Sequence, residues 1–234
     1  MSVPNVLAER YASPAMRAIW EPEAKIIAER QLWIAVMRAQ AAAGLDIPEA
    51  TIADYEAALA TVDLDSIAER ERITKHDVKA RIEEFNALAG HESIHLGMTS
   101  RDLTENVEQM QIRDSLALIR DKSVAALDRL AGLAVAYSET AMAGRSHNVA
   151  AQITTLGKRF ATFSQEMLIA FDRVEELLAR YPMRGIKGPV GTAQDMLDLL
   201  DGDASKLADL ERSVAGHLGF DAVLTSVGQV YPRS

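Results

Sequence analysis

Cysteine is missing from the 234 residues of this chain. Its absence excludes disulfides, cysteine-bound zinc and a thiol nucleophile. Aromatic residues are also scarce, at 5%, whereas 48% of the residues are hydrophobic. This mix, with alanine and leucine prominent, favours packed helices over a sheet. The formal net charge of −9 argues against a broad nucleic-acid or membrane surface, because such surfaces need a basic field.

Long apolar runs and a recognisable targeting signal are missing too. No apolar stretch reaches the roughly eighteen residues of a membrane-spanning helix. The first residues, Met1-Ser2-Val3-Pro4-Asn5, lack the basic and apolar regions of a signal peptide. We therefore expect a soluble, cytoplasmic protein that has neither a membrane nor a nucleic acid as its partner. A small anionic molecule could still bind through a few local cations.

Apolar residues recur at helical spacing through most of the chain, and proline and glycine mark the breaks. Ser13-Pro14 has the N-cap and first-turn proline that begin a helix, and Gly44 is placed to end one. The pattern predicts helices at about 14–20, 22–43, 48–62, 64–73, 74–90, 102–140, 154–181, 192–200 and 204–218. It contains no convincing strand, so the predicted fold class is all-α.

Two of the predicted helices are too long for ordinary globular packing. The stretch from Asp102 to Thr140 has no proline, one glycine and an apolar stripe at helical spacing. The helix from Thr154 to Tyr181 follows after a short interruption, so the two should lie antiparallel in a bundle of long rods. We expect an N-terminal helical domain at 1–98 and part of a long-helix bundle domain at 99–234.

Hydroxyl side chains stand at the start of the first long helix. Gly97 permits a turn, Thr99 and Ser100 follow it, and Asp102 lies in the first helical turn. One interpretation is a capped helix start and nothing more. The other is an anion site, because free N–H groups at the positive end of a long helix suit a carboxylate or phosphate.

Two histidines lie beside other polar groups at predicted helix boundaries. Lys75-His76-Asp77 places an imidazole next to a carboxylate, which favours the charged imidazole and suits a proton donor. The same residues could be a capped surface turn. His147 lies in the interruption 144–148, where it could act as an acid or base, or be a satisfied loop histidine.

Two further patterns are less specific. The segment 91–95 reads H-E-x-x-H, as in zinc proteases, but Gly90 and Gly97 leave barely one turn for a motif that needs a sustained helix. No metal ligand is therefore predicted. The glycine-rich loop 185–192 could cradle an anion, yet no strand precedes it and its spacing fits neither nucleotide-binding fingerprint. A tight turn is the simpler interpretation.

The order of the polar motifs resembles the adenylosuccinate lyase family of the fumarase/aspartase superfamily, over essentially the whole chain. The matching segments are Arg10-Tyr11 with Ser13-Pro14, Lys75-His76-Asp77-Val78, His95-x-Gly97-x-Thr99-Ser100-x-Asp102, Gly144-Arg145-Ser146-His147, Thr154-Thr155-Leu156-Gly157 and Gly185-x-Lys187-Gly188-x-Val190-Gly191-Thr192. Thr-Ser-x-Asp indicates the superfamily only, whereas Arg-Tyr, Lys-His-Asp-Val and Gly-Arg-Ser-His favour the adenylosuccinate branch. That family usually reads Gly-Arg-Thr-His-Gly, so Ser146 keeps the hydroxyl and Asn148 departs from the pattern.

The resemblance implies a lyase that releases fumarate by β-elimination from adenylosuccinate and from SAICAR, giving AMP and AICAR without a metal or redox cofactor. It implies that His147 is the acid/base group for the leaving nitrogen and that His76 assists or orients the substrate. Thr99 and Ser100 would hold a succinyl carboxylate. The other substrate-binding residues that it implies are Arg10, Tyr11, Lys75, Asp77, His95, Ser146 and Gln229.

One family signature is not found in the 234 residues. It is the mobile Gly-Ser-Ser-x-Met-Pro-x-Lys-x-Asn loop, which carries the serine taken as the general base. The resemblance thus covers an N-terminal portion of the family chain, and we expect the isolated chain to be inactive. The family is a homotetramer whose sites combine residues from three subunits, so a homo-oligomer is expected. Another lyase of the superfamily and a non-catalytic helical scaffold stay open as alternatives.

Overall fold

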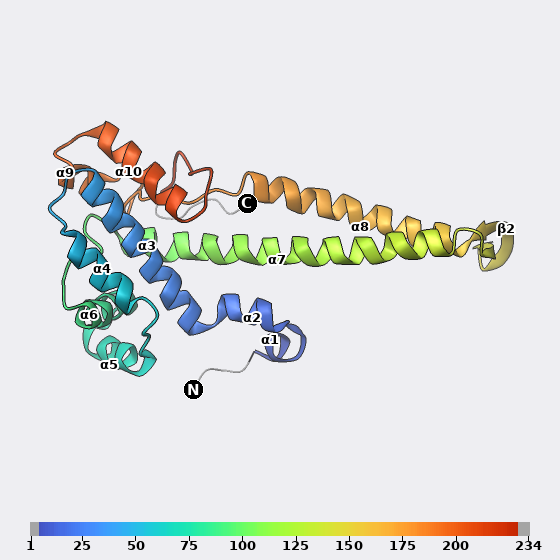
Figure 1. The fold of residues 1–234 in the computed structure, drawn as a ribbon, viewed down its shortest axis with the longest axis horizontal. Coiled ribbons are helices and arrows are strands. Elements are labelled where there is room, and N and C mark those ends of the chain that lie inside the picture. Colours follow the sequence, from blue (N-terminus) through green and yellow to red (C-terminus); the bar gives the residue numbers. More distant parts are fainter. Residues whose placement is uncertain (1–4, 229–234) are drawn as a thin grey trace. The chain divides into compact units, whose positions relative to one another are not determined.

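The computed structural model describes residues 5–228 of the chain (Figure 1). Most of these residues are helical, which confirms the predicted all-α class. The chain divides into two compact units. The first unit consists of residues 1–113 and 181–234, and the second of residues 114–180. The domain division expected at residues 98 and 99 stays a prediction.

The first unit is built from short and medium helices. They are α1 (Val6–Tyr11), α2 (Pro14–Trp20), α3 (Pro22–Ala42), α4 (Glu49–Ala58), α5 (Leu64–Thr74), α6 (Asp77–Ala89), α9 (Gln194–Leu199) and α10 (Ala204–His217), together with the beginning of α7 (Ser100–Ala136). Local chemistry sets several of their starts. Ser13 Oγ accepts from the Met16 N–H at 3.2 Å ahead of Pro14, which is the predicted N-cap.

Helix α3 lies at the centre of the first unit and packs against α2, α4 and α10. Its Trp33 stacks on Phe85 of α6 with ring centroids 6.2 Å apart, and Phe85 in turn meets Tyr55 of α4 at 4.9 Å. All three side chains are buried. Arg30 of α3 is buried as well, and its guanidinium binds Glu84 at 2.6 Å and the carbonyls of Ala58, Leu59 and Thr61 at 2.9 Å.

The second unit is a pair of antiparallel helices with a β-hairpin at one end (Figure 1). The remainder of α7 runs beside α8 (Leu156–Ala179): Arg120 Nε lies 3.7 Å from Glu175, and the rings of Tyr137 and Phe160 are 6.1 Å apart. The two long antiparallel helices were predicted. Within residues 114–180, all of which the structure describes, Gly157 is the single buried residue. The unit therefore has almost no core of its own.

The hairpin contradicts the expectation that the chain holds no strand. Strand β1 (Ala141–Ser146) pairs antiparallel with β2 (Val149–Thr155), with an irregular register at Gly144 and Arg145. His147 and Asn148 form its two-residue turn, at φ 48° and 64°, the left-handed pair that a type I′ turn needs. Asparagine tolerates that conformation well, so Asn148 suits the position where the family pattern has glycine.

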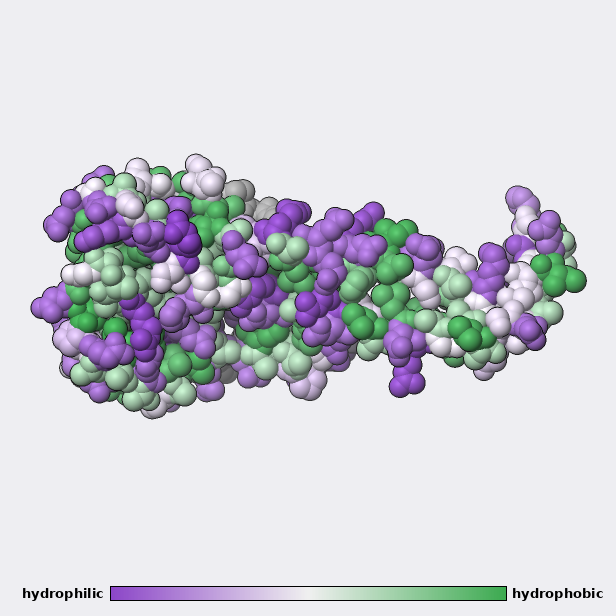
Figure 2. Space-filling view, turned by 45° about the horizontal axis from the view of Figure 1, so that its top comes forward, coloured by the Kyte–Doolittle hydropathy of each residue, from purple (hydrophilic) through white to green (hydrophobic). Residues whose placement is uncertain are grey.

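Apolar side chains remain exposed on the second unit. Figure 2 shows several apolar (green) patches on the long-helix part of the molecule. Val135 of α7 is 75% exposed and Ile153 of β2 is 86% exposed. No helix within residues 5–228 combines the length and apolar character of a membrane span.

Candidate functional site

The beginning of α7 is organised by a reciprocal pair of hydrogen bonds. The Asp102 N–H donates to the Thr99 carbonyl at 3.0 Å, and the Thr99 N–H donates to Asp102 Oδ2 at 2.9 Å. The second bond is the return half of a capping box. Thr99 and Ser100 are half-buried at the N-terminal end of a helix of 37 residues. This places their hydroxyls where the helix favours negative charge.

Asp102 also binds the glycine-rich loop, which comes from a distant part of the sequence. Its Oδ1 accepts from the backbone N–H groups of Lys187 at 2.9 Å and Gly188 at 3.0 Å. Burial raises the pKa of Asp102, although the Thr99 N–H, Arg184 and the Lys187 N–H oppose that effect. The loop does bind an anionic group, but the group is the protein's own carboxylate. The loop therefore acts as a structural turn that holds the beginning of α7.

Arg184 is a central residue that the sequence analysis did not select. It is buried, and its guanidinium pairs with Asp102 at 2.5 Å and with Glu105 at 2.6 Å. Asn106 adds two bonds to the backbone of Gly185, at 3.0 and 3.1 Å. A signal was present in the sequence: two acids three residues apart, on the buried side of a helix, need a cation.

His76 caps helix α6 and also approaches Ser100. Its Nδ1 accepts from the Lys79 N–H at 3.3 Å and lies 3.6 Å from Asp77 Oδ1, while its Nε2 lies 3.5 Å from Ser100 Oγ. The capped-turn interpretation is therefore correct, and the same turn brings the imidazole to the hydroxyls of the α7 start. Lys75 precedes it in the left-handed region, at φ 55°.

Asp77 is the first of three residues, on helices α6 and α3, that are connected by ion pairs. Arg81 Nη2 donates to Asp77 Oδ2 at 2.9 Å, and Arg81 Nε lies 2.6 Å from Glu29 Oε2 of α3. Burial acts to raise the pKa of Asp77, but the Val78 N–H and Arg81 outweigh it and lower that pKa. Burial raises the pKa of Glu29 to about 7 against the opposing charge of Arg81. Asp77 is thus kept as a carboxylate beside His76.

His95 lies in the loop between α6 and α7, next to the same group of residues. Trp33 Nε1 donates to its Nδ1 at 3.0 Å. Burial, with a contribution from the charge of nearby His76, lowers the pKa of His95 to about 4. His95 is therefore neutral near pH 7.

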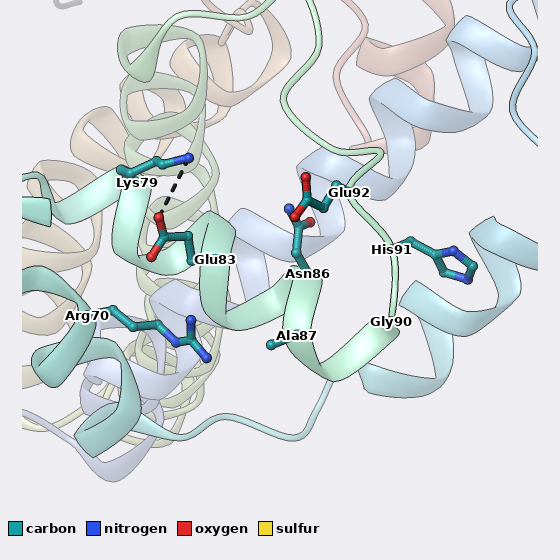
Figure 3. A pocket seen from close by; sticks show the side chains of 8 residues that line it. All are labelled: Arg70, Lys79, Glu83, Asn86, Ala87, Gly90, His91 and Glu92. Atoms are coloured by element: carbon teal, nitrogen blue, oxygen red, sulfur yellow. Dashed lines mark ion pairs between the residues drawn. The ribbon is translucent and has the colours of Figure 1, made fainter. Parts of the chain in front are cut away.

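The H-E-x-x-H segment forms no helix, as its flanking glycines indicate. His91 points away to Asp54, at 2.8 Å, while His95 is held by Trp33. His91 and Glu92 line an open polar pocket of about 540 Å³ beside α6 (Figure 3), together with residues of α5 and α6 such as Arg70 and Lys79. Within residues 5–228 no three acidic or imidazole groups gather as metal ligands.

Other predicted site residues lie apart from this group. Arg10 and Tyr11, at the end of α1, are exposed, and within residues 5–228 their side chains form no hydrogen bond or ion pair. Ser146 and His147 are exposed at the tip of the hairpin in the second unit. Gln229 lies outside the described residues. The structure thus brings together His76, Asp77, His95, Thr99 and Ser100.

Comparison with known proteins identifies relatives of this chain. A family model described as a lyase matches residues 10–210. Adenylosuccinate lyase of Schistosoma mansoni is 34% identical over 98% of this chain and 48% of its own length. The enzyme of Saccharomyces cerevisiae is 34% identical over 97% of the chain and 48% of its own length. The chain therefore spans about half the length of these curated relatives.

Solved structures show the same fold. A fumarate lyase from Mesorhizobium sp. BNC1 superposes with a TM-score of 0.78 and 28% identity, over 92% of this chain and 50% of that one. A 3-carboxy-cis,cis-muconate lactonizing enzyme from Pseudomonas putida has a TM-score of 0.80 at 23% identity, over 94% of this chain and 50% of that one. The resemblance drawn from the motifs is confirmed: the chain belongs to the lyase family, where adenylosuccinate lyases are among its relatives.

Proposed function

We propose that this chain belongs to an enzyme that releases fumarate by β-elimination from adenylosuccinate and SAICAR, giving AMP and AICAR. The observation that carries the proposal is the meeting of His76 with Ser100, at 3.5 Å, at the positive end of a 37-residue helix. A dicarboxylate substrate needs fixed donors for the negative charge that grows on it when a proton leaves the carbon beside a carboxylate. Half-buried hydroxyls and N–H groups at a helix start are such donors.

In this proposal Thr99 and Ser100 bind a succinyl carboxylate, and His76 orients the substrate or transfers a proton. Asp77, held by Arg81, keeps a negative charge 3.6 Å from His76. His95 supports the anion site. Lys75, Arg10 and Tyr11 bind the nucleotide part of the substrate, with Ser146 and Gln229 as further contacts. The reaction as proposed uses no metal and no redox cofactor.

His147 is proposed as the group that protonates the departing nitrogen. It lies in a different unit from His76, at a turn whose two residues both have positive φ. A complete site is proposed to form only when copies of the protein associate, as a tetramer by resemblance. The exposed apolar side chains of the second unit support association, because residues 114–180 bury only Gly157 within one copy. We also propose a cytoplasmic location, and no lyase activity for the isolated 234-residue chain.

The experiment is an assay of fumarate release by the protein in its full natural length, with adenylosuccinate and SAICAR as alternative substrates. Turnover of both substrates supports the proposal. Turnover of another succinyl-amine or a muconate, with neither purine compound accepted, would favour a different lyase of the superfamily. Normal turnover by a His147→Asn protein would favour the non-catalytic interpretation of the hairpin residues.

A further inference from the structure

The ring of His95 is held by an unusual partner, the indole of Trp33. Trp33 Nε1 donates to His95 Nδ1 at 3.0 Å. An indole nitrogen can only donate a hydrogen bond, so the Nδ1 that faces it has to be unprotonated. A neutral imidazole with an unprotonated Nδ1 carries its proton on Nε2. The contact therefore selects one of the two neutral forms of His95.

The indole is itself fixed in place. Trp33 is 1% exposed, in the middle of α3, and stacks on Phe85 at 6.2 Å. It meets the His95 ring edge-on, with centroids 6.0 Å apart. Rotating the indole away would disturb a close-packed core. The donor is consequently pre-oriented before any ligand arrives.

Protonation of both ring nitrogens is opposed at this position. A proton on Nδ1 would place two donors against each other and leave the Trp33 N–H without an acceptor. Burial, and then the charge of His76, also lower the pKa of His95 to about 4. His76 at the start of α6 is the charged or titratable group that acts on His95; α3 contributes the indole, which does not titrate.

The other ring nitrogen, Nε2, is not used in a contact within the described part of the protein. Within residues 5–228 no protein group accepts a hydrogen bond from His95 Nε2, and this nitrogen is not a buried atom without a partner. His95 adopts φ 66° in the loop that leads to Thr99. It lies close enough to His76, which approaches Ser100 at 3.5 Å, for the charge of His76 to act on it.

We propose that Trp33 is a positioning residue that fixes His95 as the Nε2–H form, so that His95 meets the anionic substrate as a neutral, directional donor and not as a cation. The identity of the ligand rests on the proposed function, whereas the protonation pattern does not. Trp33 is therefore assigned an influence on substrate binding although it lies in the core.

The test is nitrogen NMR of the 234-residue chain labelled with ¹⁵N in histidine and tryptophan, near pH 7. A His95→Asn variant assigns the His95 signals, since asparagine tolerates the left-handed conformation. The expected result is a protonated Nε2, an unprotonated Nδ1, and a coupling across the hydrogen bond between Trp33 Nε1 and His95 Nδ1. A protonated Nδ1, or an average of the two forms without that coupling, would overturn the proposal. None of these readouts depends on lyase activity.

A variant pair then tests the role of Trp33. Trp33→Phe keeps an aromatic ring but removes the donor, and Trp20→Phe, at a residue 47% exposed, is the matched control. In Trp33→Phe the His95 signals should move to an average of the two neutral forms, and in Trp20→Phe they should stay. In the active enzyme Trp33→Phe should raise KM about tenfold with a smaller change in kcat. An unchanged Nε2–H form in a folded Trp33→Phe protein would refute the role of Trp33, and if that variant does not fold, the coupling in the unaltered chain decides.

Discussion

At position 147 the conformation of the backbone determines which substitution is informative. His147 has a φ of 48°, where alanine would be strained and asparagine is tolerated. His147→Asn therefore removes the imidazole without disturbing the turn. If His147 protonates the leaving nitrogen, kcat for fumarate release by the full-length protein should fall by about 10²–10⁴-fold. Asn148→Gly, which also suits a positive φ, is the control and should leave kcat near its original value.

Buried Glu29 and half-buried His95 should make the free energy of unfolding depend on pH in opposite directions. Burial raises the pKa of Glu29 from 4.5 to about 7, so the unfolded chain releases this proton first. Stability from Glu29 is then present at low pH and is lost as the pH rises from about 4.5 to 7. The pKa of His95 is lowered from 6.5 to about 4, so its contribution is lost as the pH falls through that window.

The two contributions overlap and should largely cancel in the unaltered chain, so each becomes visible when the other is removed. Glu29→Gln should lose stability on acidification from pH 7 to 5, and His95→Asn should gain it, by about 1–3 kcal/mol in each case. Urea unfolding at several pH values measures both. Parallel pH profiles for the two variants would contradict the opposed signs.

At the scale of elements, the buried carboxylate of Asp102 connects the start of α7 to the loop that contains Lys187 and Gly188. Asp102→Asn would leave Arg184 with a buried charge only partly compensated by Glu105. The expected loss is about 3–5 kcal/mol in the free energy of unfolding. Asp121→Asn, at an exposed ion pair with Arg120, should change it by about 0.5 kcal/mol or less. Equal effects of the two substitutions on the free energy of unfolding, measured by denaturant titration, would argue against a stabilising role for the Asp102 carboxylate.

Gly157 of α8 and Gly132 of α7 should respond in opposite ways to substitution by alanine. A Cβ at Gly157 would lie 2.4 Å from the Ala134 carbonyl oxygen and 2.7 Å from Ser138 Cα, whereas a Cβ at Gly132 meets nothing within 4 Å. Gly157→Ala should therefore destabilise the second unit by about 1–3 kcal/mol. Gly132→Ala should stabilise it by up to about 1 kcal/mol, because alanine is the better helix former. Hydrogen exchange of amides in α8 measures the stability of both variants. A change of stability in the same direction for both would contradict the close contact at Gly157.

At the scale of the whole molecule, the second unit is proposed to gain its missing core from other copies. Val135→Glu places a charge on an exposed apolar position of α7 that is 75% exposed in one copy. If this face is covered by another copy, the substitution should shift the protein to smaller species in sedimentation. Ile73→Glu changes a residue of α5 in the first unit that is similarly exposed, at 78%, and serves as the control. Unchanged assembly of the Val135→Glu protein would count against this surface.

Much of the fold could be read from residue patterns because helices are set by local chemistry. Ser13-Pro14 begins α2 as predicted, and the long stretches with little proline or glycine form α7 and α8. The hairpin was missed because its strands are short, and its turn is His147-Asn148, not the Asn-Gly or Asp-Gly pair that signals such a turn. The alternation of Val149-Ala150-Ala151-Gln152-Ile153 was too weak to indicate a strand.

The candidate site was only partly predictable, for a related reason. His76, Thr99 and Ser100 were selected by motif, but the partners that hold them in place were not. Arg184 and Trp33 belong to other segments, and no local pattern indicates that one meets Asp102 and the other His95. Such partners are brought close by packing between elements that are distant in the sequence.

By itself, the sequence determined the helical class, the two long helices and the resemblance to a lyase family, because capping, helical periodicity and motif order are properties of neighbouring residues. Only the tertiary structure decided that His76 lies 3.5 Å from Ser100, that the glycine-rich loop binds Asp102, and that Trp33 dictates the proton position on His95. These three outcomes depend on burial and on contacts between distant segments. Burial sets the cost of an unpaired charge or donor, and a linear sequence does not state which groups become buried together.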